Sequence, residues 1–338
     1  MIYPNFLKEN DTIGVTAPSD GITKEGKIKR LNFAIQNFAK KGFLIQETSN
    51  VRTSIKGKSS DSKTQALELE SLFLNPNIKM IFCAAGGDFL LEMLSFINFE
   101  TIKLNPKWLQ GYSDPTGLLY TITTNLDIAT IYGDNFAQFG MCPWHKSLEY
   151  NLELLKGNIT TQESFLEYES MGHHDYKNGD ETYILDKKVC WESLNNEDEI
   201  QLEGRIIGGC LDILTEIFGT RFDNTLQFVD KYQQDGIIWY FDNCELSSEG
   251  IIRTLWKFKD NGYFNHCKGI IFGRSATETS FYDISFKEAI KYSLKDLDIP
   301  VIINADIGHV SPRMTIINGA LAEVNYFKNK GSIKFILK

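Results

Sequence analysis

The feature that most constrains the fold is the alternation of strand-like and helix-like segments through the first half of the chain. Short apolar runs rich in β-branched residues predict strands at 12–17, 43–46, 80–84 and 108–111. Apolar residues at helical spacing predict helices at 24–41, 64–74, 90–97 and 115–124. This alternation favours a mostly parallel sheet with helices on both faces.

The second half follows a polar stretch. Residues 157–179 and 195–199 are largely polar and rich in turn formers, so we interpret 151–203 as a linker and flap. Beyond it, apolar runs predict strands at 237–241, 269–273, 300–304 and 316–322, with helices at 249–259 and 286–294. We therefore predict an N-terminal domain over 1–150 and a second α/β, β-rich domain over 204–338.

The charge balance narrows the classes of partner. The net charge is −9, and the lysines are scattered among acidic residues. Binding of nucleic acid or of an anionic membrane needs a clustered basic surface, so we expect neither partner. The start of the chain has no charged segment followed by a long apolar run, which argues against a secretory signal. No apolar run is long enough to predict a transmembrane helix.

The six cysteines include no Cys-x-x-Cys pair, and most lie in or beside apolar runs. We interpret them as buried free thiols in a reducing compartment, which predicts a cytoplasmic protein. Cys142 and His145 have the spacing of half a zinc site, but no second ligand pair is evident. We therefore expect neither a metal nor another cofactor.

A candidate catalytic motif is Gly111-Tyr112-Ser113-Asp114-Pro115, where a predicted strand meets a predicted helix. A serine at such a turn projects its hydroxyl outward, and the helix N-terminus supplies unpaired N–H groups that suit an oxyanion. Pro115 fits the first helical turn, where a missing N–H does no harm. The alternative is that Ser113 or Asp114 only caps the helix, and the motif lacks the second glycine of G-x-S-x-G.

A second glycine-rich turn, Gly86-Gly87-Asp88, follows the predicted strand at 80–84. Two glycines allow the backbone to approach a ligand closely, and the N–H of Gly87 together with that of Asp114 would form an oxyanion hole. A tight turn between strand and helix is the alternative. A phosphate loop is disfavoured, because neither G-x-G-x-x-G nor a Gly-Lys-Ser/Thr ending is present.

Among the histidines, His309 stands apart because it follows a predicted strand, where site residues of α/β domains usually lie. The others lie in polar or loop contexts: His145, His173, His174 and His266. Asp242 directly follows the strand at 237–241, and a carboxylate on the far ring nitrogen would orient the imidazole. Glu245 is an alternative acid. A structural role for His309, or a capping role for Asp242, stays open at this point.

Together, these motifs resemble the LD-carboxypeptidases and their relatives, the microcin C immunity peptidases. The segments that carry the resemblance run in order from DTIGVTAPS at the start through GGD, GYSD, GRIIGGCLDIL, IIWYFDN and GIIFGR to GHVSPRMTIINGA. The resemblance covers nearly the whole chain. It implies two domains, with the serine on the first, the acid and histidine on the second, and the site in the cleft between them.

The resemblance also implies roles. Ser113 would be the nucleophile, His309 the general base, and Gly87 and Asp114 the donors of the oxyanion hole. The acid that orients the histidine in this family is a glutamate at the position of Asp242. The aspartate side chain here is shorter, so its carboxylate reaches about 1.5 Å less far. Four further residues are expected at the substrate: Gly86, Asp88, Trp191 and Glu245. For Trp191, stacking on an aromatic base and a place in the core are both open.

The expected substrate is a small peptide, such as a muropeptide tetrapeptide that loses its terminal D-alanine. The immunity-type alternative is a peptidyl- or aminoacyl-nucleotide amide, and the flap would choose between them. A homodimer is usual for such proteins. Two other classes also remain: a non-catalytic binder of small peptides on this scaffold, and a sugar- or nucleotide-binding protein, which the missing phosphate loop disfavours.

Overall fold

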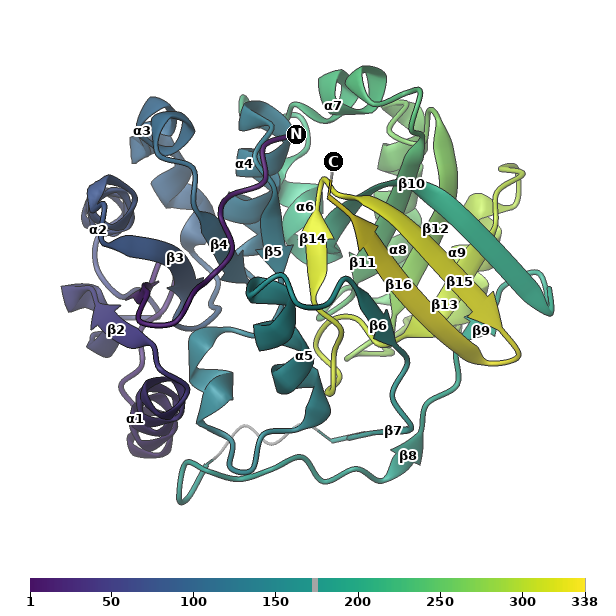
Figure 1. Ribbon diagram of the computed structural model, residues 1–338. Coiled ribbons are helices and arrows are strands. Elements are labelled where there is room, and N and C mark those ends of the chain that lie inside the picture. Colours follow the sequence, from purple (N-terminus) through teal and green to yellow (C-terminus); the bar gives the residue numbers. More distant parts are fainter. Residues whose placement is uncertain (172–175, 338) are drawn as a thin grey trace.

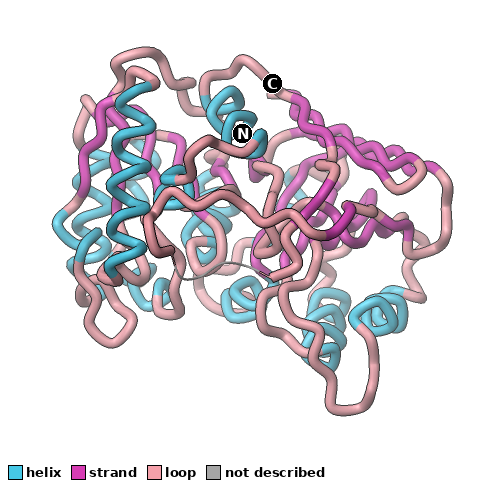
Figure 2. The backbone as a smooth tube through the Cα atoms, turned by 90° about the horizontal axis from the view of Figure 1, so that it is seen from below, coloured by secondary structure: helices cyan, strands magenta, loops and turns pink. Residues whose placement is uncertain are grey.

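The computed structural model describes residues 1–171 and 176–337, which form two lobes side by side (Figure 1). Each lobe is built on its own sheet. A long segment between them, drawn in teal, passes below α5 (Lys146–Leu155) in Figure 1 and across the junction of the lobes in the view from below (Figure 2). We call its described part from Glu167 to Lys188 the strap; it includes the short ribbon of β7 (Glu167–Tyr168) and β8 (Lys187–Lys188).

The first lobe contains a six-stranded sheet in the order β14-β5-β4-β3-β1-β2. Its parallel strands are β1 (Thr12–Thr16), β2 (Leu44–Glu47), β3 (Ile78–Cys83), β4 (Trp108–Gly111) and β5 (Thr130–Tyr132). The helices of this lobe are α1 (Glu25–Lys40), η1 (Ser49–Arg52), α2 (Ser62–Leu74), η2 (Leu90–Phe96), α3 (Phe99–Leu104), α4 (Thr116–Leu126), η3 (Phe136–Gly140) and α5. The antiparallel edge strand β14 (Ile316–Asn318) comes from the far end of the chain.

The second lobe contains an eight-stranded mixed sheet in the order β6-β16-β15-β10-β11-β12-β13-β9. Its parallel centre consists of β10 (Glu199–Cys210), β11 (Ile237–Asp242), β12 (Cys267–Gly273) and β13 (Val301–Ala305). The antiparallel strands are β6 (Thr161–Glu163), β9 (Glu192–Ser193), β15 (Leu321–Phe327) and β16 (Lys330–Ile336). The helices are α6 (Leu211–Ile217), α7 (Thr225–Lys231), α8 (Ser248–Asp260) and α9 (Phe286–Leu294).

Helix α4 joins the two lobes. Its sequence TGLLYTITT is apolar or small on every side, and residues 116–124 are all buried, as expected for a helix packed on all faces. It contacts β4 and β5 in the first lobe and β10 and α6 in the second. The hydroxyl of Thr116 accepts a hydrogen bond from the N–H of Cys210 at 3.1 Å, and a Cβ on Gly209 would lie 2.5 Å from Thr116. The start of α4 is therefore held close to the end of β10.

The predicted fold class is confirmed: an α/β protein with a mainly parallel first sheet and a second β-rich half. One predicted strand, 316–322, is instead two strands in different sheets, because the chain turns at Gly319, whose φ is +82°. Within the predicted linker, β6 and β9 pair with the second sheet, and α5 crosses residue 150. The domain boundaries at 150 and 203 stay predictions.

The expectation for the cysteines was only partly right. All six are free thiols, but only Cys83 and Cys210 are buried, whereas Cys142 and Cys190 are exposed. Both exposed cysteines lie outside strands and helices, so their apolar neighbours in sequence do not bury them. No helix in the described part of the chain has the length and apolar character needed to cross a membrane.

Candidate active site

Ser113 occupies the turn between β4 and α4 in a left-handed conformation, with φ of +69°. Such a conformation is uncommon for a residue other than glycine and is often found at functional sites. Its carbonyl accepts a hydrogen bond from Thr116 N–H at 2.9 Å, which ties the turn to the helix. No side-chain hydrogen bond caps α4, so neither Ser113 nor Asp114 acts as its cap. The hydroxyl of Ser113 is directed elsewhere.

That hydroxyl meets the imidazole of His309 from the other lobe. The Oγ of Ser113 lies 2.9 Å from Nε2 of His309, and Nδ1 of His309 lies 2.6 Å from Oδ2 of Asp242. The other carboxylate oxygen, Oδ1, accepts the backbone N–H of His309 at 3.0 Å. Asp242 is fully buried at the end of β11. The three side chains thus form one unbroken hydrogen-bond chain across the two lobes.

The charges of His309 and Asp242 stabilise each other. Burial disfavours the charged form of His309, but the charge and hydrogen bond of Asp242 outweigh it and hold the pKa of the imidazole well above 6.5. Burial likewise acts to raise the pKa of Asp242, yet its contacts with His309 and Tyr132 keep that pKa below 3.8. The arrangement therefore favours an imidazolium beside a carboxylate, the state a general base reaches after taking a proton.

Asp242 reaches His309 although its side chain is short, because the histidine loop comes unusually close. Gly308 has φ of +93°, and a Cβ at this position would lie only 1.9 Å from Oδ1 of Asp242. Only glycine fits such a close approach. Glu245 lies exposed on the following turn, and Asp242 is the carboxylate that contacts the imidazole.

The glycine turn after β3 lies directly beside Ser113. A Cβ on Gly86 would be 3.3 Å from the serine Oγ. Gly87 has φ of +152°, and a Cβ there would lie 2.2 Å from Oγ of Ser19, so this position requires glycine. Within the described chain, the backbone N–H groups of Gly87 and Asp114 donate no hydrogen bond. Their predicted role as donors of an oxyanion hole stays a prediction.

The side chain of Asp114 accepts hydrogen bonds from two other segments of the first lobe. Its Oδ2 accepts hydrogen bonds from the Ser19 hydroxyl and, at 2.9 Å, from the N–H of Leu90. Burial raises the pKa of this carboxyl above its usual value, although the hydrogen bonds from Ser19 and Leu90 oppose the shift. Asp88, expected at the substrate, is exposed close to this carboxyl. The Asp114 side chain thus ties the serine turn to two neighbouring loops of the first lobe.

Two adjoining hollows open beside the chain of hydrogen bonds. The first, of about 160 Å³, includes Lys27, Gly86 and Tyr112 in its wall. The second, of about 70 Å³, includes His309 and Tyr183. Four residues line both: Arg30, Tyr112, Gln138 and Tyr176. Because Tyr176 and Tyr183 belong to the strap, this segment forms part of the wall that a substrate would meet.

Trp191 is a core residue, so its expected place at the substrate is wrong. Its side chain is fully buried, and its Nε1 donates a hydrogen bond to Oδ2 of Asp306 at 3.0 Å. A Cβ on Gly331 would lie 2.1 Å from its ring. The ring is thus packed against β16 and has no face open to a nucleobase.

The other histidines lie apart from this hydrogen-bond chain or outside the described residues. His145 caps α5 by accepting the N–H of Ser147 at 3.1 Å, and burial lowers its pKa. His266 adopts positive φ in the turn before β12. His173 and His174 lie outside the described residues.

One group in the described part of the chain has the geometry to hold a metal ion. The ligand atoms of Cys210, Asp242 and His309 lie within 4.8 Å of one another. Asp242 and His309 belong to the series of hydrogen bonds that ends at Ser113. Burial raises the pKa of the Cys210 thiol well above its ordinary value. A cation here would compete with the proton that His309 shares with Asp242.

The sequence reasoning missed Tyr132, the last residue of β5. Its hydroxyl donates a hydrogen bond to Oδ2 of Asp242 at 2.5 Å, across the two lobes. The available signal was its position at the carboxyl end of a parallel strand, the edge where Ser113 and Asp242 also lie.

Replacing Tyr132 with phenylalanine tests this contact. A hydrogen bond to a charged group contributes about 1.5–3 kcal/mol, so kcat should fall by about 10- to 150-fold while KM stays nearly constant. Tyr240→Phe is the matched control, because its hydroxyl is equally buried but bonds Asn318 at 2.8 Å. Steady-state kinetics in which both variants lose the same activity would contradict a specific role of Tyr132.

Comparison with known proteins matches both halves of the chain to one family. Residues 13–133 match the family model of the LD-carboxypeptidase N-terminal domain, and residues 203–324 match that of the C-terminal domain. The chain belongs to the LD-carboxypeptidase family. This family of serine peptidases is thus represented here by both of its domains, and Ser113 and Asp242 lie within the matched segments.

Relatives of this LD-carboxypeptidase family member align over most of their length. The microcin C7 self-immunity protein MccF of Escherichia coli is 27% identical, covering 96% of this chain and 93% of that protein. A Bacillus subtilis protein named "Probable murein peptide carboxypeptidase" is 22% identical, with 95% and 91% covered. The crystal structure of an MccF-like protein from Bacillus anthracis covers 100% of both chains with a TM-score of 0.85 and 25% identity.

Proposed function

We propose that this protein is a serine carboxypeptidase that cleaves an amide bond near the C-terminus of a small peptide. Ser113 is the nucleophile, His309 the general base, and Asp242 the acid that orients it. The observation that carries the proposal is the hydrogen-bond chain from Ser113 Oγ through His309 to Asp242, with distances of 2.9 and 2.6 Å. A hydroxyl, an imidazole and a buried carboxylate in this order are the arrangement used to activate a serine.

The proposed reaction has two halves. His309 takes the proton of Ser113, whose Oγ attacks the amide carbonyl, and the N–H groups of Gly87 and Asp114 stabilise the tetrahedral oxyanion. His309 then protonates the leaving amine, which departs and leaves an acyl-enzyme. Water deprotonated by His309 hydrolyses that ester and restores the free serine.

The preferred substrate is a muropeptide tetrapeptide that releases its terminal D-alanine. Such a substrate ends in a free carboxylate close to the scissile bond. The hollow beside Gly86 includes Lys27 and Arg30, and none of its described lining residues is acidic. Lys27 at this place would suit an anionic peptide terminus, whereas Arg30 is almost fully buried and the adjoining hollow includes Glu169 and Glu181. The name of the Bacillus subtilis relative supports the same substrate class.

The alternative substrate is a peptidyl- or aminoacyl-nucleotide amide, which the similarity to MccF supports. Trp191 does not serve such a substrate here, because its ring is fully buried. Tyr112 and Tyr176 line the hollows beside Ser113 and offer aromatic surface to a base instead. The strap, which supplies Tyr176, is the element that would choose between the two substrates.

Mass spectrometry of reaction products separates these substrates. The protein is incubated in parallel with a muropeptide tetrapeptide and with an aminoacyl sulfamoyl adenosine. Release of D-alanine from the tetrapeptide supports the carboxypeptidase, and release of the free amino acid from the nucleotide analogue supports the immunity-type hydrolase. If neither substrate is cleaved and a fluorophosphonate does not label Ser113, the results support the alternative of a non-catalytic protein that binds small peptides. A homodimer and a cytoplasmic location remain expectations.

The pH dependence of kcat/KM follows from the raised pKa of His309. A general base acts only in its neutral form, and the pKa of His309 lies well above 6.5 because of Asp242. Activity should therefore fall as the pH drops, with the acid limb above pH 6.5. A profile of kcat/KM against pH checks this, and full activity well below that limb would contradict His309 as the base.

A further inference from the structure

The loop between β13 and β14 carries His309 but has no regular secondary structure of its own. Two arginines bond its backbone carbonyls. Arg274 donates to the carbonyls of Val310 and Pro312 at 3.1 and 2.9 Å. Arg313 donates to the carbonyls of Gly308 and His309, the second at 3.3 Å. Guanidinium groups thus replace the neighbouring strand that would otherwise satisfy these carbonyls.

The two arginines differ in where their charge is balanced. Arg274 pairs with Asp306, which lies in the same lobe. Arg313 pairs with Asp134, which follows β5 in the first lobe. Both side chains of the Asp134–Arg313 pair are only 3% exposed. Arg313 therefore connects the histidine loop to the lobe that carries Ser113.

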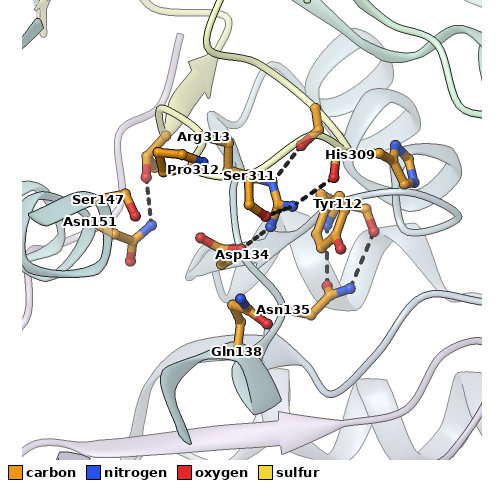
Figure 3. A network of polar contacts seen from close by, with 12 residues as sticks. Tyr112, Asp134, Asn135, Gln138, Ser147, Asn151, His309, Ser311, Pro312 and Arg313 are labelled. Carbon is orange, nitrogen blue, oxygen red and sulfur yellow. Dashed lines mark hydrogen bonds and ion pairs between the residues drawn. The ribbon is translucent and has the colours of Figure 1, made fainter. Parts of the chain in front are cut away.

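A second contact of Arg313 reaches the residue next to Ser113. Its guanidinium lies 4.2 Å from the ring centre of Tyr112, and that ring packs edge-on against the imidazole of His309 at 5.2 Å. The N–H of Tyr112 in turn donates to Asn135, the neighbour of Asp134, at 3.2 Å. Figure 3 shows Arg313 between Asp134, Tyr112 and the histidine loop.

We infer that Asp134 and Arg313 form a positioning pair that holds the imidazole of His309 in line with the hydroxyl of Ser113. This inference rests on the proposed function. The guanidinium group of Arg313 donates hydrogen bonds to the loop at residues 308, 309 and 311. The same group packs over the ring of Tyr112. Its ion pair with Asp134 holds the loop against the first lobe. Neither residue touches the reacting atoms. Their effect is on geometry, and a displacement of about 1 Å at such a site costs on the order of 100-fold in rate.

Variants of the pair separate positioning from simple stabilisation. Asp134→Asn removes the negative charge that pairs with Arg313. Arg313→Lys keeps a positive charge but loses the planar guanidinium group that bonds several loop atoms at once. Breaking a buried pair leaves an uncompensated charge that can prevent folding. The double variant Asp134→Leu/Arg313→Met avoids this problem, because it buries no charge. Lys231→Met is a control at the surface, since it breaks a partly exposed ion pair between the lobes, with Asp127 at 2.8 Å.

The readout is the rate at which a fluorophosphonate labels Ser113, measured well below the melting temperature of each variant. We expect labelling of the pair variants to slow by about 10- to 100-fold. The fluorophosphonate concentration that gives the half-maximal rate should change little. Lys231→Met should label at nearly the wild-type rate. Folded pair variants, including the double variant, that label as fast as wild type overturn this inference alone. Absence of labelling in the wild type overturns the proposed function, and this inference with it.

Discussion

Replacing Ser113 with alanine is expected to lower hydrolysis of the substrate by at least about 10⁴-fold. The Oγ that would attack the carbonyl, which is the atom 2.9 Å from Nε2 of His309, is removed. The fold should persist, because the turn is held by the carbonyl of Ser113 and by the side chain of Asp114. Turnover by mass spectrometry, together with circular dichroism, checks both points.

Two further variants sharpen this result. Ser113→Gly adopts the positive φ of +69° freely, so equal inactivity of this variant excludes backbone strain as the cause. Ser71→Ala removes an exposed hydroxyl on α2 that only bonds the carbonyl of Glu68, and it should keep full activity. Turnover by folded Ser113→Ala within a factor of ten of wild type would remove Ser113 from the mechanism.

Replacing Asp242 with asparagine is expected to lower kcat by about 10⁴-fold. The amide keeps the shape of the side chain but loses the charge that raises the pKa of His309. Its N–H₂ group can also donate to Nδ1, which would leave the proton of His309 on the nitrogen that faces Ser113. In that tautomer the imidazole has no lone pair with which to accept the serine proton.

Glu245→Gln is the matched control for this experiment. Glu245 is the second acid that the sequence offered, and it lies exposed on the neighbouring turn. Kinetics should show nearly wild-type kcat for this variant. The acid limb of residual activity in Asp242→Asn should move to lower pH, since the pKa of His309 falls. A large loss in Glu245→Gln with an active Asp242→Asn would reverse the assignment of the acid.

The place of the site was predictable because its residues lie at the carboxyl ends of parallel strands. Gly87 follows β3, Ser113 follows β4, Asp242 ends β11, and His309 follows β13. Short apolar runs locate these strands, and the candidate residues stand at the strand ends or within four positions after them. The motif order then predicts which residues serve together. Their distances, however, depend on how two lobes meet, which no local pattern specifies.

The features that escaped prediction arise from contacts between distant segments. Trp191 lies in a polar stretch of sequence, yet β16 and Asp306 enclose its ring completely. Arg313 and Asp134 are 179 residues apart, and neither belongs to a periodic pattern. Local propensity carries no information on such pairs, because the tertiary fold alone makes them neighbours.

Trapping the acyl-enzyme tests the central claim most directly. The protein is mixed with the muropeptide tetrapeptide and, in parallel, with the aminoacyl sulfamoyl adenosine, quenched in acid, and digested for peptide mass mapping. We predict an adduct equal to the acyl part of the cleaved substrate on Ser113, absent from Ser113→Ala. Turnover with the adduct on another residue, or turnover that persists in Ser113→Ala, would contradict the account.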